Sequence, residues 1–147
     1  TSNRDVPLAS AISAQDQLYV VGYEGSADGS YKDVTLWQTN TDGTLLPFAR
    51  IDMDSQEQGK AVTVDANGFV YMAWVSGNNS YAGKFDAYGN QLWVSDYSSR
   101  KGTQNVAAIA VDALGNVFIA GQTNVSPDRN VTHGGGQDYF LVKFNRP

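Results

Sequence analysis

The chain contains no cysteine and a single histidine, and these absences exclude several kinds of chemistry. Without cysteine there is no disulfide, no thiolate nucleophile and no zinc site with cysteine ligands. One histidine cannot supply a metal site that needs several imidazoles. No apolar run approaches the roughly 18 residues of a membrane-spanning helix. No charged and then apolar leader opens the chain, so we expect any signal peptide to have been removed or to lie outside this segment.

Charged residues are also scarce, at 17% of 147 residues, against about a quarter in an average globular protein. The chain has 15 acidic and 10 basic residues, a net charge of −5 and an isoelectric point near 4.6. The cations are scattered, and Arg100 and Lys101 are their one adjacent pair. Phosphate binding requires clustered Lys and Arg, so this composition argues against a nucleic-acid partner.

Glycine, aspartate and aromatic residues are plentiful. The chain has 15 Gly, its acidic residues are all Asp apart from Glu24 and Glu57, and 12% of its residues are aromatic. This composition favours turns and strands over helices. The length suits one domain, and we expect that domain to be all-β.

Three segments of the chain align with one another, at residues 9–19, 61–71 and 108–118. The second and third are 47 residues apart and share Asp-Ala-x-Gly between two short apolar runs. Asp accepts hydrogen bonds from amides two residues on, and Gly takes the left-handed conformation without steric cost, so the pattern predicts a tight hairpin. In the first copy Ser13 replaces the Asp, and Asp16 replaces the Gly in a position that Asp tolerates well.

Each repeat is expected to form up to four short antiparallel strands, without helices. The predicted strands are 8–13, 17–23, 33–39 and 45–52, then 60–64, 69–75, 80–86 and 91–97, then 106–111, 116–122 and 138–144. Four-stranded units repeated every 40 to 50 residues are typical of β-propeller blades. A β-sandwich or a solenoid is the competing interpretation, but a sandwich does not need one hairpin sequence three times, and β-helix repeats are much shorter.

We therefore predict one partial β-propeller over residues 1–147. Its blades are expected at about 8–52, 60–97 and 106–144, the last without its outer strand. The innermost strands are expected at 9–12, 61–64 and 108–111. Propellers close with about four to eight blades, and open strand edges and apolar faces are avoided. An incomplete ring of about three blades should therefore need the remainder of a longer chain, or other copies of this one, as partners.

The third repeat resembles a known family. Its stretch Ala108–Thr123, which reads Ala-Ile-Ala-Val-Asp-Ala-Leu-Gly-Asn-Val-Phe-Ile-Ala-Gly-Gln-Thr, is similar to the bacterial seven-bladed β-propeller repeat, often called the SBBP repeat. The segment Gly134–Phe144 resembles that family's Gly-Gly-x-Asp-aromatic segment, so the resemblance is strongest over residues 108–144. It implies blades of a secreted or cell-surface bacterial protein, and it implies no reaction, because the motif residues are turn and core residues.

The loops between the second and third strands differ most among the repeats. They are six residues longer in the first repeat and twelve longer in the third than in the second. In a propeller these loops lie on one face, and insertions on one face usually mark the binding side. The segments 24–32 and 123–137 carry the candidate ligand-binding residues, which are Asp28, Tyr31, Asp128, Arg129, Asn130 and His133. The alternative is that both are solvated loops of a diverged repeat.

Metal ligation has little support in the sequence. Asp33, Asn79 and Asp138 share one position at the head of a third strand, where we favour the capping of loop amides over calcium ligation. Asp52 and Asp54 fall on the same side of a strand, but they lack the glycine and the spacing of a calcium loop. We predict no metal site and no cofactor, with calcium as the one alternative.

The three tryptophans fall at strand positions, where large aromatic residues usually pack between blades. These are Trp37, Trp74 and Trp93. The alternative is that Trp74, Tyr81 or Tyr97 stacks on a sugar.

Signatures of catalysis are missing from the sequence. There is no Gly-x-Ser-x-Gly elbow and no phosphate-binding Gly-x-x-x-x-Gly-Lys loop, and a Ser-His-Asp triad would depend on His133 in a glycine-flanked loop. We therefore favour a non-enzymatic module that binds or adheres to a carbohydrate or protein, in a secreted or cell-surface bacterial protein. The alternative is a fragment of a propeller enzyme, a glycoside hydrolase or lyase, with its active centre at the ring axis.

Overall fold

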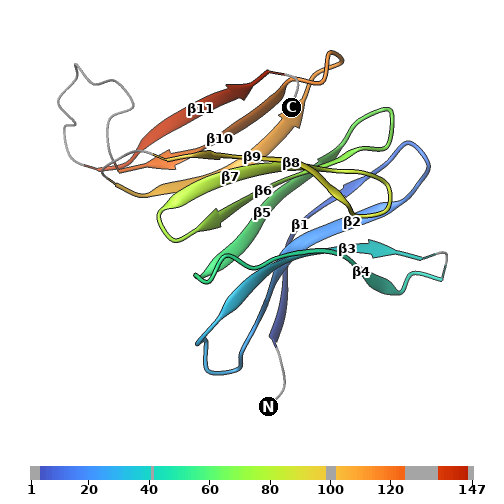
Figure 1. Ribbon diagram of the computed structural model, residues 1–147, viewed down its shortest axis with the longest axis horizontal. Coiled ribbons are helices and arrows are strands. Elements are labelled where there is room, and N and C mark those ends of the chain that lie inside the picture. The colour runs from blue at the N-terminus through green and yellow to red at the C-terminus, as the bar shows by residue number, and fades with distance from the viewer. Residues whose placement is uncertain (1–3, 41, 99–101, 125–135, 146–147) are drawn as a thin grey trace.

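The computed structural model describes residues 4–40, 42–98, 102–124 and 136–145. These residues form eleven β-strands and no helix (Figure 1), which confirms the all-β prediction. Consequently, none of the described segments is a helix of the length and hydropathy that crossing a membrane requires.

The strands are arranged in three antiparallel sheets, each following chain order. The first sheet contains β1 (Arg4–Ile12), β2 (Leu18–Gly25), β3 (Lys32–Thr39) and β4 (Leu45–Ile51). The second contains β5 (Glu57–Val64), β6 (Val70–Ser76), β7 (Asn79–Phe85) and β8 (Gln91–Tyr97). The third contains β9 (Gln104–Val111), β10 (Val117–Thr123) and β11 (Asp138–Phe144). All eleven predicted strands are present.

The first strand of each sheet begins earlier than predicted, at residues 4, 57 and 104 instead of 8, 60 and 106. In each of these strands one residue interrupts the pairing register with the second strand, namely Leu8, Lys60 and Ala107. Such a bulge breaks the alternation of side chains between the two faces. The apolar pattern therefore stops at the bulge, although the strand continues toward the N-terminus.

The three sheets stand side by side as successive layers (Figure 1), and together they form an incomplete ring. β1 contacts β5, and β5 contacts β9, so the first strands of the sheets follow one another. Each of them lies at one edge of its sheet. This arrangement is that of consecutive propeller blades whose first strands are innermost.

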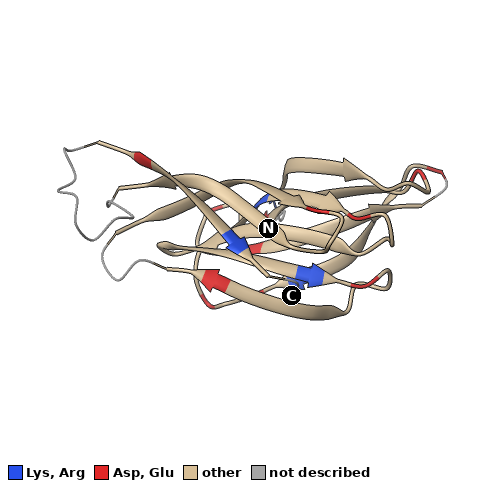
Figure 2. Cartoon of the chain, turned by 90° about the horizontal axis from the view of Figure 1, so that it is seen from above, with Lys and Arg blue, Asp and Glu red and all other residues tan. Residues whose placement is uncertain are grey.

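The predicted hairpins are present, and the repeated Asp organises them. The Oδ1 of Asp65 accepts hydrogen bonds from the amides of Asn67 and Phe69, at 2.9 and 3.0 Å. Ser13 Oγ does the same for two amides of the first repeat. Asp16 occupies the glycine position with a φ of 59°, as its place in the repeat predicted. The turns and strand ends carry most of the acidic residues (Figure 2).

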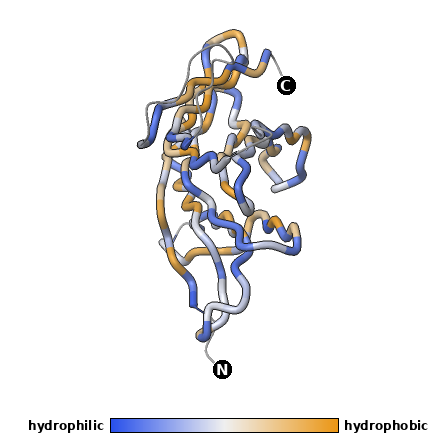
Figure 3. The backbone as a smooth tube through the Cα atoms, turned by 90° about the vertical axis from the view of Figure 1, so that its left-hand side faces the viewer, coloured by the Kyte–Doolittle hydropathy of each residue, from blue (hydrophilic) through white to orange (hydrophobic). Residues whose placement is uncertain are grey.

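The core lies between the sheets. Alternate residues of β6 face opposite ways, so that Met72 and Trp74 pack against the first sheet, and Tyr71 and Ala73 pack against the third. All four are fully buried. Apolar residues accordingly line the strands, and hydrophilic ones gather at the turns (Figure 3). The second sheet is therefore an interior blade with two apolar faces.

The third sheet leaves its outer face open. Phe118 occupies the position of the buried Tyr71 but is half-buried. Leu141 occupies the position of Ala82, which is 0% exposed, and is itself 68% exposed. Positions that the next blade covers in the second sheet are thus covered by no further sheet of the described residues in the third.

Candidate functional site

An acidic pocket of about 660 Å³ opens between the first and second sheets. We call it the acidic pocket, and its lining residues are Ser30, Tyr31, Asp33, Arg50, Asp52, Asp54, Ser55 and Gln56. Six of them come from the β2–β3 loop and from the connection between β4 and β5, and Asp33 and Arg50 come from β3 and β4. Gln56 joins the two segments, because it forms an isolated bridge with Lys32 and its Nε2 donates to the Ser30 carbonyl at 3.0 Å.

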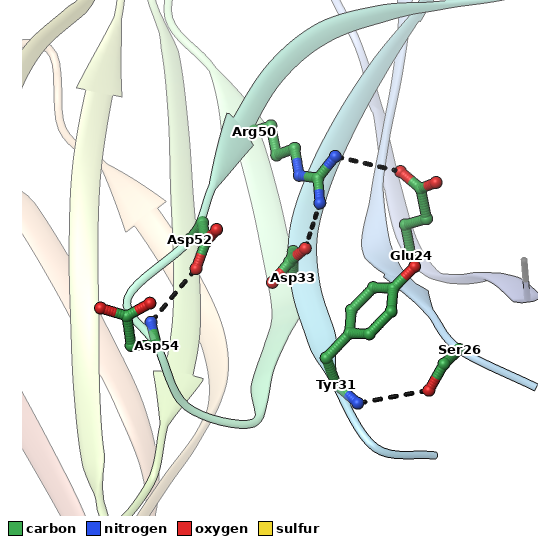
Figure 4. A network of polar contacts seen from close by, with 7 residues as sticks. All are labelled: Glu24, Ser26, Tyr31, Asp33, Arg50, Asp52 and Asp54. Atoms are coloured by element: carbon green, nitrogen blue, oxygen red, sulfur yellow. Dashed lines mark hydrogen bonds and ion pairs between the residues drawn. The ribbon is translucent and has the colours of Figure 1, made fainter. Parts of the chain in front are cut away.

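The β2–β3 loop is held by its own hydrogen bonds. Ser26 Oγ accepts from the Ser30 and Tyr31 amides at 2.8 and 3.3 Å, and Asp28 Oδ1 also accepts from the Ser30 amide, at 3.0 Å. Hydrogen bonds from Ser26 and Ser30 lower the pKa of Asp28 to about 2. The loop therefore holds the Tyr31 backbone at the pocket (Figure 4) in a fixed position.

Arg50 is the cation at the pocket, and it links its own strand, β4, to β3 and β2 of the first sheet (Figure 4). Its guanidinium donates to Asp33 Oδ2 and forms an ion pair with Glu24 at 3.8 Å. The hydrogen bond to Asp33 is the main reason why the pKa of Arg50 is raised. Because Asp33 is buried, Arg50 compensates a charge that water cannot solvate.

Asp52 and Asp54 follow β4 and form a tight turn. The Asp54 amide donates to Asp52 Oδ1 at 3.1 Å, and Asp54 itself has a φ of 57°. Within the described residues neither carboxylate has a cationic side chain within ion-pair distance. The pocket therefore carries more negative charge than Arg50 neutralises.

Glu57 lies behind the pocket at the start of β5 and is 0% exposed. Its Oε1 accepts a hydrogen bond from Ser76 Oγ at 3.0 Å, whereas its Oε2 is buried without any partner of normal geometry. Desolvation raises the pKa of Glu57, and the hydrogen bond from Ser76 and the nearby Met53 and Ser55 amides oppose this only in part. One carboxylate oxygen from each of Asp33, Asp52 and Glu57 lies within 4.8 Å of the others.

The junction between the second and third sheets has the same positions without these charges. Asn79 stands at the position of Asp33, Ser98 at that of Asp52, and Gln104 at that of Glu57. Gln104 is 1% exposed, so its position is as deeply buried as that of Glu57. The acidic cluster is therefore specific to the first junction.

The structure places only two of the predicted ligand-binding residues. Tyr31 lines the acidic pocket, and Asp28 lines a smaller pocket of about 230 Å³ beside Arg4 and Lys32. The other four, Asp128, Arg129, Asn130 and His133, lie outside the described residues.

The role expected of Asp33 is corrected: it binds the Arg50 side chain from the neighbouring strand instead of capping loop amides. The prediction of interblade packing is confirmed for Trp74, which is fully buried and stacks on Tyr81 with ring centroids 5.5 Å apart. Because Trp74 is buried, it cannot stack on a sugar.

Arg50 and Glu57 were not among the predicted site residues. Glu57 has a signal in the repeat pattern, because the equivalent position of the next repeat, 47 residues later, holds the neutral Gln104.

Comparisons with known proteins agree with this architecture. Residues 99–127 match a family model described as the β-propeller repeat SBBP. A solved structure from Bacteroides caccae, of a protein of unknown function, is similar with a TM-score of 0.57 and 10% sequence identity. The similarity covers 96% of this chain and 46% of that one, so the chain spans about half of its length. At this identity the likeness shows the fold alone.

No curated protein is similar to the chain in sequence. The match to the family model falls on the third repeat, where the sequence resemblance is strongest. The resemblance is thereby confirmed over residues 99–127, which are similar to the SBBP β-propeller repeat.

Proposed function

We propose that the chain is a non-enzymatic binding module of a secreted or cell-surface bacterial protein and that its polar ligand docks in the acidic pocket. The observation that supports this is the position of the pocket. It is formed by a long β2–β3 loop and a blade-to-blade connection, which share one face of a propeller, the face predicted to bind. The extracellular location rests on the SBBP resemblance alone.

The chemistry of the pocket favours a ligand rich in hydrogen-bond donors. Asp33, Asp52 and Asp54 offer carboxylate oxygens, and Arg50, which contacts Asp33, and Tyr31 offer donors. Sugar hydroxyls and the ammonium or guanidinium groups of a basic protein segment meet such oxygens well. The loop geometry needs no rearrangement before binding, because Ser26 already fixes it.

The open face of the third sheet supports a second part of the proposal, that further blades complete the ring. Ala82 of the second sheet and Leu141 of the third are at equivalent repeat positions, but Ala82 is buried by the next sheet and Leu141 is exposed. The face that packs against a neighbouring blade in the second sheet is therefore uncovered in the third. These blades come from more of the same polypeptide or from a second copy of the chain.

A glycosidase-like role is the second candidate, because three carboxylates approach one another. Such a reaction requires a protonated carboxyl in contact with the glycosidic oxygen. Glu57 has the raised pKa, but its side chain is fully buried. The burial that raises this pKa also keeps the Glu57 carboxyl out of reach of a substrate, and we favour binding without turnover.

A glycan array and an array of basic peptides, probed with the full chain, test the proposed function. For any ligand found, Tyr31→Ala and Asp54→Asn should each weaken binding by about tenfold. Tyr88→Ala is the matched control, since Tyr88 is 87% exposed in a hairpin that does not line the pocket. Equal loss in the control, or none in the pocket variants, would place the ligand elsewhere.

A further inference from the structure

We propose that Asp33, Asp52 and Glu57 bind a divalent cation of the calcium type between the first and second sheets. The inference rests on the proposed function, because it assigns an inorganic ligand to the acidic pocket. The three carboxylates come from β3, from the β4–β5 connection and from β5, so the ion would join two blades.

The negative charges of the cluster exceed the positive charge that balances them. The ligand oxygens of the three residues lie within 4.8 Å of one another, a distance at which like charges repel strongly in a partly buried site. Arg50 neutralises Asp33 and also contacts Glu24. Within the described part of the chain, Asp52 and Glu57 have no cation of their own, so one divalent ion would remove the repulsion.

One buried oxygen of Glu57 has no hydrogen-bond partner of normal geometry, although the Met53 and Ser55 amides are nearby. The side chain is 0% exposed, and Oε2 makes no hydrogen bond while Oε1 is bound by Ser76. A buried oxygen without a partner costs free energy unless something binds it. Because it belongs to the cluster that Asp33 and Asp52 complete, a cation shared by all three supplies the missing partner.

The second junction, between the second and third sheets, serves as an internal control. There the same three positions hold Asn79, Ser98 and Gln104, which are all neutral. The fold therefore needs polar groups at these positions, but it does not need carboxylates. The carboxylates at the first junction are therefore not required by the fold, and we attribute them to the binding of a cation.

The identity of the ion follows from the donors. All three offer oxygen, and hard divalent cations prefer oxygen ligands. Ca²⁺ accepts six to eight oxygens in irregular geometry, whereas Mg²⁺ requires a regular octahedron. The three carboxylates come from three segments, and two of them, Asp33 and Asp52, line a pocket open to water. This arrangement suits the less regular requirement of Ca²⁺.

The test is a calorimetric titration of the full chain, freed of metal by a chelator, with Ca²⁺ alone. We expect one site with a dissociation constant of about 10⁻³ M or tighter, the range of extracellular calcium modules. Tb³⁺ luminescence excited through aromatic residues reports the same site, since Tyr31 lines the pocket. The melting temperature should rise with Ca²⁺ concentration, because the ion binds only the folded chain.

Three variants locate the ion. Glu57→Gln and Asp52→Asn should each lower the Ca²⁺ affinity by at least about tenfold. Without Ca²⁺, Glu57→Gln should melt no lower than the wild type, because Gln is the residue at the equivalent buried position, 104. Asp138→Asn, at the position of Asp33 in the third sheet, is the control and should bind as the wild type does. If Glu57→Gln does not fold, the Ca²⁺ affinity of Asp52→Asn decides whether the ion binds at this cluster, because Asp52 is exposed and its substitution should not affect folding.

Absence of binding at about 10 mM Ca²⁺, ten times the weakest expected constant, would overturn the inference, as would unchanged affinity in both pocket variants. Repeating the glycan and peptide arrays in chelator separates the two proposals. A ligand that binds the pocket while Ca²⁺ does not would sustain the proposed function and overturn the cation site. Ca²⁺ binding without binding of any glycan or peptide would sustain the cation site and overturn the proposed function.

Discussion

Glu57 and Gln104 occupy the same position in successive sheets, 47 residues apart, and both are buried. The charged residue has an oxygen without a hydrogen-bond partner and lies among carboxylates. The neutral residue stands at a junction where the equivalent positions are Asn79 and Ser98. The same repeat position is therefore buried at both junctions, but it holds an ionisable side chain only at the first.

Gln104→Glu should destabilise the chain by at least about 2 kcal/mol at pH 7, because a charged carboxylate would replace a neutral amide at a position that is 1% exposed. Urea denaturation measures the loss. At pH 4 the penalty should shrink, since burial raises the pKa of the new carboxyl and the neutral form is tolerated. A variant as stable as the wild type at pH 7 would show that the second junction admits water.

Arg50→Ala should cost about 1–3 kcal/mol, because it leaves the buried Asp33 carboxylate without its partner. In the double variant with Asp33→Asn the cost of losing Arg50 should be smaller, since the charge that needs compensation is gone. A double-mutant cycle from denaturation curves gives the coupling. Strictly additive losses would mean that the ion pair contributes nothing to stability.

Gly59→Ala should destabilise the first junction by about 1–3 kcal/mol through overpacking. A Cβ at Gly59 would lie 2.3 Å from Val21 Cγ2 and 2.9 Å from the Gly22 carbonyl oxygen, across the junction. Gly115→Ala is the comparison, because a Cβ there has open space and only the φ of 81° opposes it. Thermal melts should show the larger loss for Gly59→Ala, and the reverse order would contradict close packing of the two sheets.

Stability should fall as the pH drops below about 4, the ordinary range of Asp. A hydrogen bond from the Asn116 side chain is the main reason why the pKa of Asp112 is lowered, and Asn90 acts likewise on Asp86. A carboxyl with a lowered pKa in the folded state contributes stability above its unfolded pKa and loses it as the pH falls through the folded value. Asp112→Asn keeps an oxygen acceptor in the turn but removes the titrating carboxyl. The midpoint of acid denaturation of this variant should therefore lie at a lower pH than that of the wild type. An unchanged acid midpoint would contradict this role of Asp112.

The full chain should associate as its concentration rises, through the open face of the third sheet. Leu141→Lys should weaken association, because Leu141 lies on the sheet face where the second sheet has the buried Ala82. Leu114→Lys is the matched control, with 65% exposure in a hairpin. Light scattering after size exclusion measures the mass. Monomers at all concentrations, or equal effects of both variants, would remove the argument for a further blade at this face.

The strands and hairpins were predictable from sequence because their causes are local. The Asp65 turn depends on residues within four positions, and the alternation of β6 follows from pleating. The strand starts were missed where bulges at Leu8 and Lys60 break that alternation. No pattern of short range marks those bulges.

The acidic pocket was only partly predictable, because its residues come from separate segments. The face was expected from loop lengths, and Tyr31 lies there. The ion pair of Arg50 with Asp33 depends on the register between β3 and β4, and Glu57 reaches the cluster through packing of one sheet on another. These relations arise only when the blades are assembled.

Because both faces of β6 are buried, the second sheet depends on both of its neighbours, and its amides should be the slowest to exchange with deuterium. Even-numbered residues of β6 pack against the first sheet and odd-numbered residues against the third, so a substitution in β6 weakens one junction and not the other. Changes at Met72 or Trp74 act on the first sheet, and changes at Tyr71 or Ala73 act on the third. In a ring that gains blades by duplication, a terminal repeat becomes an interior one. The pair Leu141 and Ala82 illustrates the loss of side-chain volume at a position that becomes covered.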